Sequence, residues 1–382
     1  MLAEYLTELY ADDEKDKKNI AVVSTGAGAD HSLIGMLNFS FYDPKRKKPR
    51  LKQAGRGGIG TVFRNKKIKA LVCKIPGVKG NLNNVVDLEA IMERGRRFNR
   101  EMRELDDKQC QMKQVGTAHL MEIMNDHDLL PVHNYKFGSH PEAYRIDSSI
   151  WKKNFTQNIP DGCWIGCNMS CSKGVDDFEI KTGPYKGHRV LVDGPEYENA
   201  AGLGSDGGMF DPGYIIEANF YCDTYGICTI TWGTAVAFIM ECFQRGILNK
   251  QRAQGFELNF GDADRALELL HMVARGEGFG KVAGMGIRKM KELFSTNGWG
   301  DPQLLQDIGF KILRFVQNQV EQAVFRPAPG QHPLRSLVQR VDGSADDDER
   351  DQPAKRPPWA MIMPLAVVPV ETSTSAVTSS TG

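Results

Sequence analysis

Three cysteines near the middle of the chain have the residue type and spacing of metal ligands. Cys163, Cys167 and Cys171 lie four residues apart in the run GCWIGCNMSC. Clustered thiolates of this kind are ligands of iron–sulfur clusters and of zinc. If the run is helical or coiled, the sulfurs lie on one side of it. Because the run supplies three ligands, a fourth has to come from another part of the chain or from a non-protein group.

A glycine-rich loop with basic neighbours indicates a site for phosphate or another anion. Residues 45–69 include eleven basic side chains and no acidic one. The pattern G-x-G-x-x-G is satisfied by Gly55, Gly57 and Gly60. However, no buried strand precedes the pattern, a basic turn follows it in place of a helix, and the acidic residue that would bind the ribose is missing. These features argue against a dinucleotide site. Glycines let backbone N–H groups approach an anion, and nearby cations neutralise it: Arg56, Arg64, Lys66 and Lys67. The alternative is a solvated hairpin with a basic rim.

Two polar turns follow the cysteine run. Residues 194–199 place Glu196 and Glu198 two positions apart in a short turn, where close packing would raise a carboxyl pKa and suit it to general acid–base catalysis. Residues 223–229 form a second turn that leads into a helix expected to begin near Thr234, and a helix N-terminus attracts anions. The alternatives are exposed turn acids in the first case and a structural turn with its helix cap in the second.

The elements expected around these motifs are mainly helical. The pattern predicts a helix within residues 1–18, strands at 20–24 and 68–72, and helix from about residue 82, where apolar residues at helical spacing alternate with arginines. Four later helices are predicted, at residues 234–249, 263–275 (between Asp262 as N-cap and Gly276 as stop), 281–295 and 302–325. We therefore predict a mainly α protein in three parts. Residues 1–75 are a remnant of a β-rich cofactor-binding domain, 76–325 a helical domain, and 326–382 a disordered tail rich in proline, serine and threonine.

Composition limits the partners and the compartment. The 382 residues carry 48 basic and 48 acidic side chains, so no overall field directs the chain to nucleic acid or to a membrane surface. Three of the eight cysteines lie in one short run and no signal peptide precedes them, which favours a reducing, cytoplasmic compartment over a disulfide framework. No apolar stretch approaches the ~20 residues that span a bilayer.

The order of these motifs resembles that of the aldehyde:ferredoxin oxidoreductase family of tungsten enzymes. The resemblance extends over roughly residues 20–310 and rests on residues 54–61, the cysteine run, residues 194–199 and residues 223–229. The cysteine spacing of the family is usually C-x2-C-x3-C, whereas here it is C-x3-C-x3-C. This difference, together with residues 37–43 and 306–309, looks most like the tungsten-bearing catalytic subunits of benzoyl-CoA reductases.

The resemblance implies a fold, cofactors and partners. The fold would be the helical middle domains of the family, preceded by the end of its β-rich domain. The cofactors would be tungsten held by two pterins (a tungsten bis-pterin), a [4Fe–4S] cluster and magnesium. The partners would be ferredoxin or other iron–sulfur subunits, and the substrate an aldehyde or an aromatic acyl-CoA. A homo-oligomer is compatible with this reading, and nucleic acid and a membrane span are not expected.

The resemblance also implies roles for individual residues. Cys163, Cys167 and Cys171 match three cluster ligands, and Glu198, with Glu196 as second choice, matches the carboxylate near the metal. Two further sets match the contacts to one pterin. Its phosphates and magnesium would meet Arg56, Gly57 and Gly58, and the pterin itself would meet the turn formed by Asp223, Gly226, Ile227 and Cys228.

The chain departs from the family pattern at both ends. Most of the first β-domain has no counterpart, and neither has the second D-x-x-G-L-C turn with its pterin and fourth cluster cysteine, since no cysteine follows Cys242. We therefore expect a partial chain. The fourth ligand stays open, because Cys228 belongs to the first turn and the family offers no precedent for the others: Cys73, Cys110, Cys222 and Cys242. Two alternatives are an inactive remnant or interaction module whose cysteines bind zinc or no metal, and a radical S-adenosylmethionine enzyme, whose C-x3-C-x2-C spacing differs from this run.

Overall fold

The computed structural model describes residues 2–75, 85–104, 111–159, 161–163 and 169–309. All of them belong to one compact unit, Met1–Glu321. Helices predominate, as the sequence predicts, and strands form a four-stranded sheet and a separate hairpin. No helix among these residues combines the length and the apolar character needed to cross a membrane.

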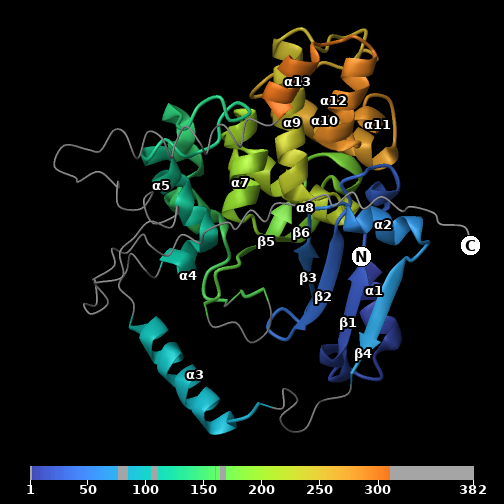
Figure 1. Ribbon diagram of the computed structural model, residues 1–382. Helices are drawn as coiled ribbons and strands as arrows, with labels where there is room; N and C mark the ends of the chain where they lie inside the picture. The colour runs from blue at the N-terminus through green and yellow to red at the C-terminus, as the bar shows by residue number, and fades with distance from the viewer. Residues whose placement is uncertain (1, 76–84, 105–110, 160, 164–168, 310–382) are drawn as a thin grey trace, which may run out of the picture. The chain divides into compact units, whose positions relative to one another are not determined.

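The N-terminal part is an antiparallel sheet in the order β3-β2-β1-β4. Its strands are β1 (Ile20–Ser24), β2 (Leu37–Asp43), β3 (Lys48–Ala54) and β4 (Ala70–Lys74). Buried and exposed residues alternate along β1, and the helix α1 (Leu2–Tyr10) packs on the buried side, where Ala3, Ile20 and Val22 form a small core (Figure 1). The tight β2–β3 pairing runs from Leu37 opposite Ala54 to Asp43 opposite Lys48, so the positions of basic residues on β3 are fixed by β2.

The sequence interpretation needs correction after β3. A short helix, α2 (Ile59–Asn65), follows the glycine loop where a basic turn was predicted, and a strand precedes the loop. The helix that seemed to be missing from the dinucleotide pattern is therefore present, whereas the preceding strand is mostly half-exposed rather than buried. The preceding strand is also part of an antiparallel sheet, whereas the dinucleotide fingerprint needs a parallel βαβ unit. The prediction that no dinucleotide binds here rests on that topology and on the missing acid.

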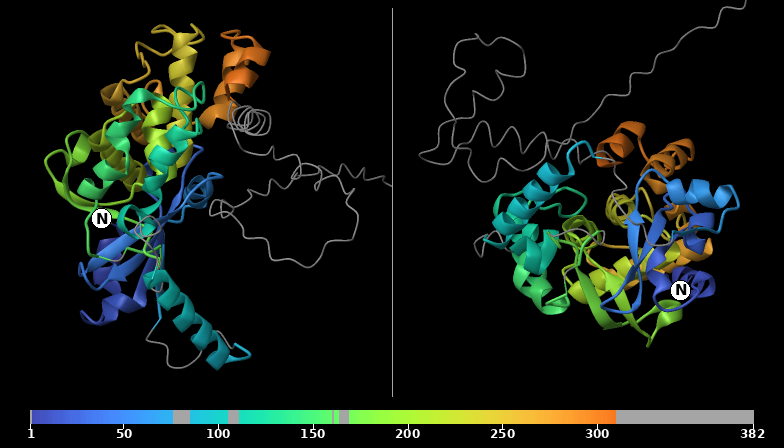
Figure 2. Two further views of the ribbon diagram at one scale, coloured as in Figure 1. Left: turned by 90° about the vertical axis from the view of Figure 1, so that its left-hand side faces the viewer. Right: turned by 90° about the horizontal axis from the view of Figure 1, so that it is seen from below.

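The central helices enclose the main hydrophobic core. They are α7 (Tyr197–Leu203), α8 (Pro212–Tyr225), α9 (Thr229–Gln244) and α10 (Ala263–Arg275). Figures 1 and 2 show α7, α8 and α9 side by side, and α9 and α10 are followed by α11 (Gly280–Ala283), α12 (Gly286–Thr296) and α13 (Pro302–Gly309). The core includes large, fully buried side chains from several of these helices, among them Tyr221, Trp232, Phe238 and Phe294.

Two of the predicted helices in this region have different limits from those expected. Helix α9 begins at Thr229, five residues before the expected start, because the chain leaves the left-handed Gly226 and re-enters a helix at once. The helix expected at 281–295 is divided into α11 and α12, because Gly286 adopts φ +75° between them. By contrast, α10 has the predicted limits, with Asp262 accepting a hydrogen bond from the Arg265 amide and Gly276 in the left-handed region.

The remaining described elements are further helices, one hairpin and short 3-10 turns. They comprise α3 (Leu88–Arg103), α4 (Gln111–Val115), α5 (Leu120–Asp126), α6 (Ser148–Asn154), the hairpin β5 (Gly174–Glu179) and β6 (Arg189–Asp193), and the 3-10 turns η1 (Asp16–Asn19), η2 (Ala27–Asp30), η3 (Gly116–His119), η4 (Pro141–Ile146), η5 (Gly183–Tyr185) and η6 (Ser205–Gly207). The predicted helix from residue 82 corresponds to α3. The last predicted helix, 302–325, is confirmed as far as Gly309, and its remainder lies outside the described residues.

Candidate functional site

The glycine loop at the end of β3 has an unusual backbone. Arg56, Gly57 and Gly58 are three consecutive residues with φ near +70°. A side chain at Gly58 would collide with the Leu33 carbonyl oxygen, 2.5 Å from an ideal Cβ, whereas a Cβ at Gly57 would meet nothing within 4 Å. The loop is therefore packed on one side and open at Gly57. A left-handed conformation at Arg56 is strained for a residue with a Cβ, and such strain is found at binding sites more often than elsewhere.

The turn at residues 223–228 lies directly against this loop. Asp223, predicted to begin a polar turn, belongs instead to the last turn of α8, and Gly226 ends that helix in the left-handed conformation. The backbone N–H of Arg56 donates to Cys228 Sγ at 3.2 Å, and the Thr231 hydroxyl does so at the same distance. The structure thus brings together two groups of predicted cofactor residues that are more than 160 positions apart in the sequence.

Backbone pairing holds this turn against the sheet. The Met36 N–H donates to the Gly226 carbonyl and the Cys228 N–H to the Ile34 carbonyl, each at 2.8 Å. Ile227 is fully buried and forms an isolated bridge with Gly35. Ile227 is therefore placed to pack the turn, while its neighbours Gly226 and Cys228 supply the polar contacts.

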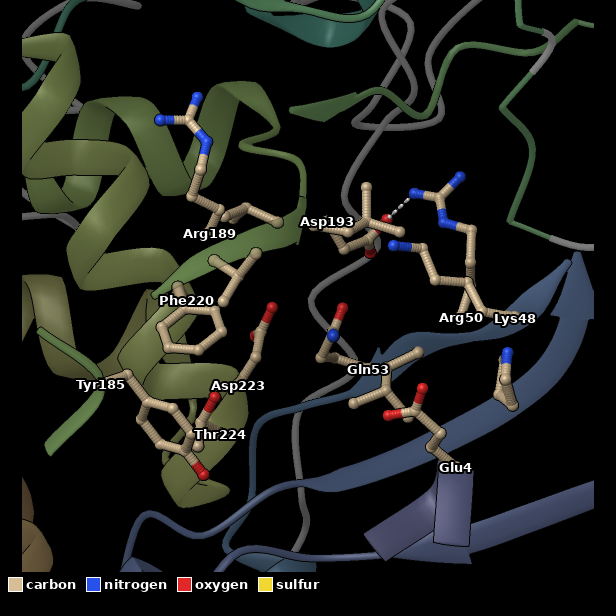
Figure 3. A pocket seen from close by; sticks show the side chains of 15 residues that line it. Glu4, Lys48, Arg50, Gln53, Tyr185, Arg189, Asp193, Phe220, Asp223 and Thr224 are labelled. Carbon is tan, nitrogen blue, oxygen red and sulfur yellow. Dashed lines mark hydrogen bonds and ion pairs between the residues drawn. The ribbon is translucent and has the colours of Figure 1, made fainter. Parts of the chain in front are cut away.

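Asp223 lies on the wall of a pocket of about 280 Å³ between α1, β3, β6 and α8 (Figure 3). The Asp223 side chain is buried, and this burial, with the nearby negative charge of Asp193, raises its pKa well above the usual range. Gln53 approaches it from β3, and the Gln53 Nε2 has no partner among the described residues. The aromatic rings of Tyr185 and Phe220 lie on the same side of the pocket as Asp223, across from β3. Asp223 lines this pocket, whereas the other residues predicted to meet the pterin, 56–58 and 226–228, are not part of its lining.

The two candidate acids have different environments at the start of α7. Glu198 is in the first turn, is exposed, and forms an ion pair with Arg56. Glu196 is the N-cap residue, is half-buried, and accepts a hydrogen bond from the Thr117 hydroxyl. Burial, with the negative charge of Asp193, raises the pKa of Glu196, although Thr117 and the Lys52 charge oppose the shift. Because its pKa is raised, Glu196 is the better proton donor or acceptor, whereas Glu198 is the partner of Arg56.

The described residues at the two ends of the cysteine run, called the cysteine loop below, lie side by side. Asp161 and Cys171 pair as a parallel bridge, which closes the loop at its base. Cys163 is exposed and Cys171 is half-buried, while Cys167 lies outside the described residues. Within the described part of the chain, no group of three or more His, Cys, Asp or Glu side chains is arranged to hold a metal ion.

Basic residues of the β2–β3 hairpin anchor this loop. Asp161 is buried and pairs with two arginines, Arg50 on β3 and Arg46 in the turn before it, the latter at 2.8 Å. At the other end of the loop, Lys52 on β3 donates a hydrogen bond to the hydroxyl of Ser172. Removing one partner of a buried ion pair is strongly destabilising, so such pairs specify one arrangement. Strand β3 therefore holds the two described ends of the cysteine loop in place.

The same strand holds the segment that leads to the acids. Asp193, the last residue of β6, pairs with Arg50 at 2.7 Å and with Lys52. Asp193 also accepts, through its backbone carbonyl, a hydrogen bond from Asn219 on α8 at 2.6 Å. Figure 3 shows the Arg50–Asp193 contact at the edge of the pocket. One strand and the loop after it thus contact the cysteine loop, the acids and the 223–228 turn.

Four of these residues were not identified from the sequence: Arg50, Lys52, Asp161 and Asp193. The basic run at residues 45–69 gave a signal, because it contains no acidic residue. A basic side chain of this run that is buried therefore needs a carboxylate from another part of the chain. Which carboxylates these are depends on long-range packing. The partners of Arg50 lie more than 100 residues away.

The comparisons with known proteins agree with this architecture. The family model described as "Aldehyde ferredoxin oxidoreductase, domains 2 & 3" matches residues 93–305, more than half of the chain. The chain therefore belongs to the aldehyde ferredoxin oxidoreductase family. This confirms the family resemblance inferred from the order of the motifs.

Individual relatives carry tungsten in their names. Tungsten-containing aldehyde ferredoxin oxidoreductases of Pyrococcus abyssi and Pyrococcus horikoshii are 31% and 29% identical, each over 76% of this chain and 44% of the relative. The WOR-like subunit of an aliphatic sulfonate oxidoreductase from Pyrococcus furiosus is 32% identical over 61% of this chain and 35% of its own length. The chain thus spans less than half the length of these curated relatives.

A solved structure with the same fold is the active-site complex BamBC of benzoyl coenzyme A reductase, in complex with 1,5-dienoyl-CoA. It matches with a TM-score of 0.52 at 15% identity, over 76% of this chain and 42% of that one. At this identity the likeness shows the fold. The chain thus has the mainly helical architecture of the family.

The residues of the site fit part of what a pterin and a cluster require. The three left-handed residues direct backbone toward the open side at Gly57, and Arg56 adds a cation beside it, which suits a phosphate. The buried Asp223 and the Gln53 amide suit the polar edge of a planar ring system. Cys163 has an exposed thiol two residues after Asp161, which pairs with Cys171. This chain therefore supplies some of the groups that a pterin and a cluster need.

Proposed function

We propose that this chain is part of a tungsten-pterin oxidoreductase. In that enzyme it would bind one pterin and provide three of the cysteine ligands of an iron–sulfur cluster. The observation that carries the proposal is the placement of the cysteine loop, Arg56 and the 223–228 turn around a single strand, β3. A cofactor held by the loop and another held by the turn would be neighbours, as electron transfer between them requires. When bound, a tungsten-pterin supplies two-electron chemistry and a cluster supplies single-electron transfer.

Each predicted site residue has a role in this proposal. Cys163, Cys167 and Cys171 would hold a [4Fe–4S] cluster. Arg56, Gly57 and Gly58 would meet the pterin phosphates and their magnesium. The pterin would also be held by Asp223 and by the turn that Gly226, Ile227 and Cys228 form.

We assign proton transfer to Glu196 rather than to Glu198. A carboxyl group with a raised pKa can take up a proton near neutral pH and release it again. Burial and the negative charge of Asp193 raise the pKa of Glu196 in that direction. Glu198, exposed and paired with Arg56, would keep that arginine and its backbone in place. This reverses the order of preference given by the family resemblance.

The proposed reaction class is oxidation of an aldehyde, with electrons passed to ferredoxin or another iron–sulfur subunit. The names of several relatives support an aldehyde. Reduction of an aromatic acyl-CoA is the alternative, and it is favoured by the fold match to a benzoyl coenzyme A reductase complex. A reducing, cytoplasmic compartment is part of the proposal, since exposed thiolate-held clusters need such conditions.

Metal analysis after anaerobic expression with tungstate tests the proposal. We expect iron in the isolated protein. Tungsten should be present in a lower amount if some of the pterin contacts come from protein outside this chain. The variants Cys163→Ser and Cys171→Ser should lose most of the iron and its visible absorption. Cys73→Ser is the matched control, because Cys73 is also exposed but lies on β4, and it should retain the wild-type iron content.

Zinc in place of iron, or no metal under any of these conditions, would contradict the proposal and favour an interaction module. Iron that is retained in both cysteine variants would contradict the assignment of the ligands. Viologen reduction assayed with an aldehyde, and viologen oxidation assayed with benzoyl-CoA, then separates the two substrate classes.

A further inference from the structure

Lys52 occupies a central position between the cysteine loop and the candidate acids. It lies on β3, and its side chain is 16% exposed. Its ammonium group donates a hydrogen bond to the hydroxyl of Ser172, the residue after Cys171, and pairs with the carboxylate of Asp193. Asp193 in turn lies three residues before Glu196. One cation therefore connects the end of the cysteine loop with the segment that leads to the acid.

The charge of Lys52 also reaches two carboxyl groups of the site, those of the half-buried Glu196 and the buried Asp223. It opposes the rise in the pKa of Glu196 and the rise in the pKa of Asp223. These effects agree with the contacts: the ammonium group lies within electrostatic range of the cysteine loop, of α7 and of the 223–228 turn.

The neighbouring charges leave Lys52 without a carboxylate of its own. Asp193 is shared with Arg50, which pairs with it at 2.7 Å. Asp161 is in turn shared between Arg50 and Arg46. Arg46 has further carboxylates in Asp43 and Asp176. Lys52, which pairs only with the shared Asp193, is thus the least compensated of these three cations. A further buried cation, Lys173, lies two residues after Cys171.

We propose that Lys52 is a positioning residue that stabilises the reduced state of the redox group held by Cys163, Cys167 and Cys171. The inference rests on the proposed function, because it assumes that these cysteines hold such a group. One-electron reduction adds one negative charge at the loop and moves no atom. A cation held nearby in a half-buried position favours that added charge more than a solvated cation would. Residues that contact the ligand segment are known to tune such centres.

The test is a redox titration of the anaerobically reconstituted full chain, followed by electron paramagnetic resonance. Lys52→Gln removes the charge and should shift the midpoint potential to a more negative value. Lys52→Arg keeps the charge and should stay close to wild type. Asp193→Asn removes the shared carboxylate and should shift the potential in the opposite direction. Lys48→Gln is the matched control, because Lys48 is on the same strand but exposed, and it should leave the potential unchanged.

An unchanged potential in Lys52→Gln would overturn the inference, and so would shifts of the same sign in Lys52→Gln and Asp193→Asn, because loss of structure alone has no reason to reverse sign. If Lys52→Gln fails to hold iron, the comparison of Asp193→Asn with wild type decides, and a shift to a more negative potential rejects the inference. Failure of the proposed function looks different: wild-type protein then contains no redox-active iron, whatever stands at position 52.

Discussion

At the scale of single residues, burial separates side chains that look alike in the sequence. Glu196 and Glu198 are two positions apart in the same turn, yet one is half-buried with a raised pKa and the other is exposed beside Arg56. His271 gives a second case. It is buried, and its ring nitrogens lie 2.8 Å from the Tyr225 hydroxyl and 3.2 Å from the Thr182 hydroxyl. Tyr225 belongs to the last turn of α8, so His271 supports the turn at residues 223–228.

His271 should make the stability of the protein depend on pH. Burial, with the nearby charge of Arg275, lowers its pKa from 6.5 to about 4. Since the unfolded chain takes up this proton first, the stabilisation by neutral His271 is complete above pH 6.5 and is lost as the pH falls toward 4. From pH 7 to pH 5 this contributes a loss of about 2 kcal/mol to the free energy of unfolding. His271→Gln should lose correspondingly less over that range in urea unfolding.

The exposed His188 provides the control for this measurement. His188→Gln should follow the wild-type pH dependence. A His271→Gln variant with the same pH dependence as wild type would show that His271 is not held in its neutral form.

Candidate site residues could be proposed from the sequence, whereas the residues that contact them could not. The family motifs locate Arg56, Cys228 and Glu198 because their spacing within each motif is local information. The contacts of Lys52 and Asp161 join segments more than 100 positions apart, and no local pattern specifies them. Charge runs such as residues 45–69 indicate only that carboxylates are needed.

At the scale of elements, amphipathic helices could be predicted and buried ones could not. Helix α10 has a polar and an apolar face with clear caps, and its predicted limits are confirmed. Helix α8 is buried on nearly all sides, so its sequence lacks the period by which a surface helix is recognised. The hairpin β5–β6 was missed as well. Its strands are short and their register shifts between Val175 and Phe178, which interrupts the alternation expected of a strand.

The crossing of α7 and α9 depends on two glycines. An ideal Cβ at Gly233 on α9 would lie 2.5 Å from the backbone of Gly202 on α7. Gly233→Ala should therefore destabilise the protein by about 1–3 kcal/mol in urea unfolding, through overpacking of the two helices. Gly95→Ala is the matched control, since Gly95 is also inside a helix, α3, but nothing lies within 4 Å of its Cβ position. It should be neutral or slightly stabilising. Equal stability of Gly233→Ala and wild type would show that the helices can separate freely.

At the scale of the whole described unit, the sheet depends on the helical part. Its own core is small, whereas main-chain and side-chain hydrogen bonds join it to the turn at residues 223–228. One of these runs from the Asn38 side chain on β2 to the Asp223 carbonyl at 2.9 Å. The division of the sequence at residue 75 remains a prediction about ancestry. For stability, the contacts across it indicate that the sheet and the helices unfold together.

Hydrogen exchange of the full chain at increasing denaturant checks this cooperativity. Amides of β1 and β2 should lose protection together with those of α8 and α9, because the sheet has too little buried apolar surface to persist alone. Asn38→Ala removes the bond to Asp223 and should lower the free energy of opening by about 1–2 kcal/mol in both sets of amides. If β1 and β2 instead open at lower denaturant while α8 and α9 stay protected, the sheet is an independent unit. In that case the contacts at residues 34–38 would serve to assemble the site rather than to stabilise the fold.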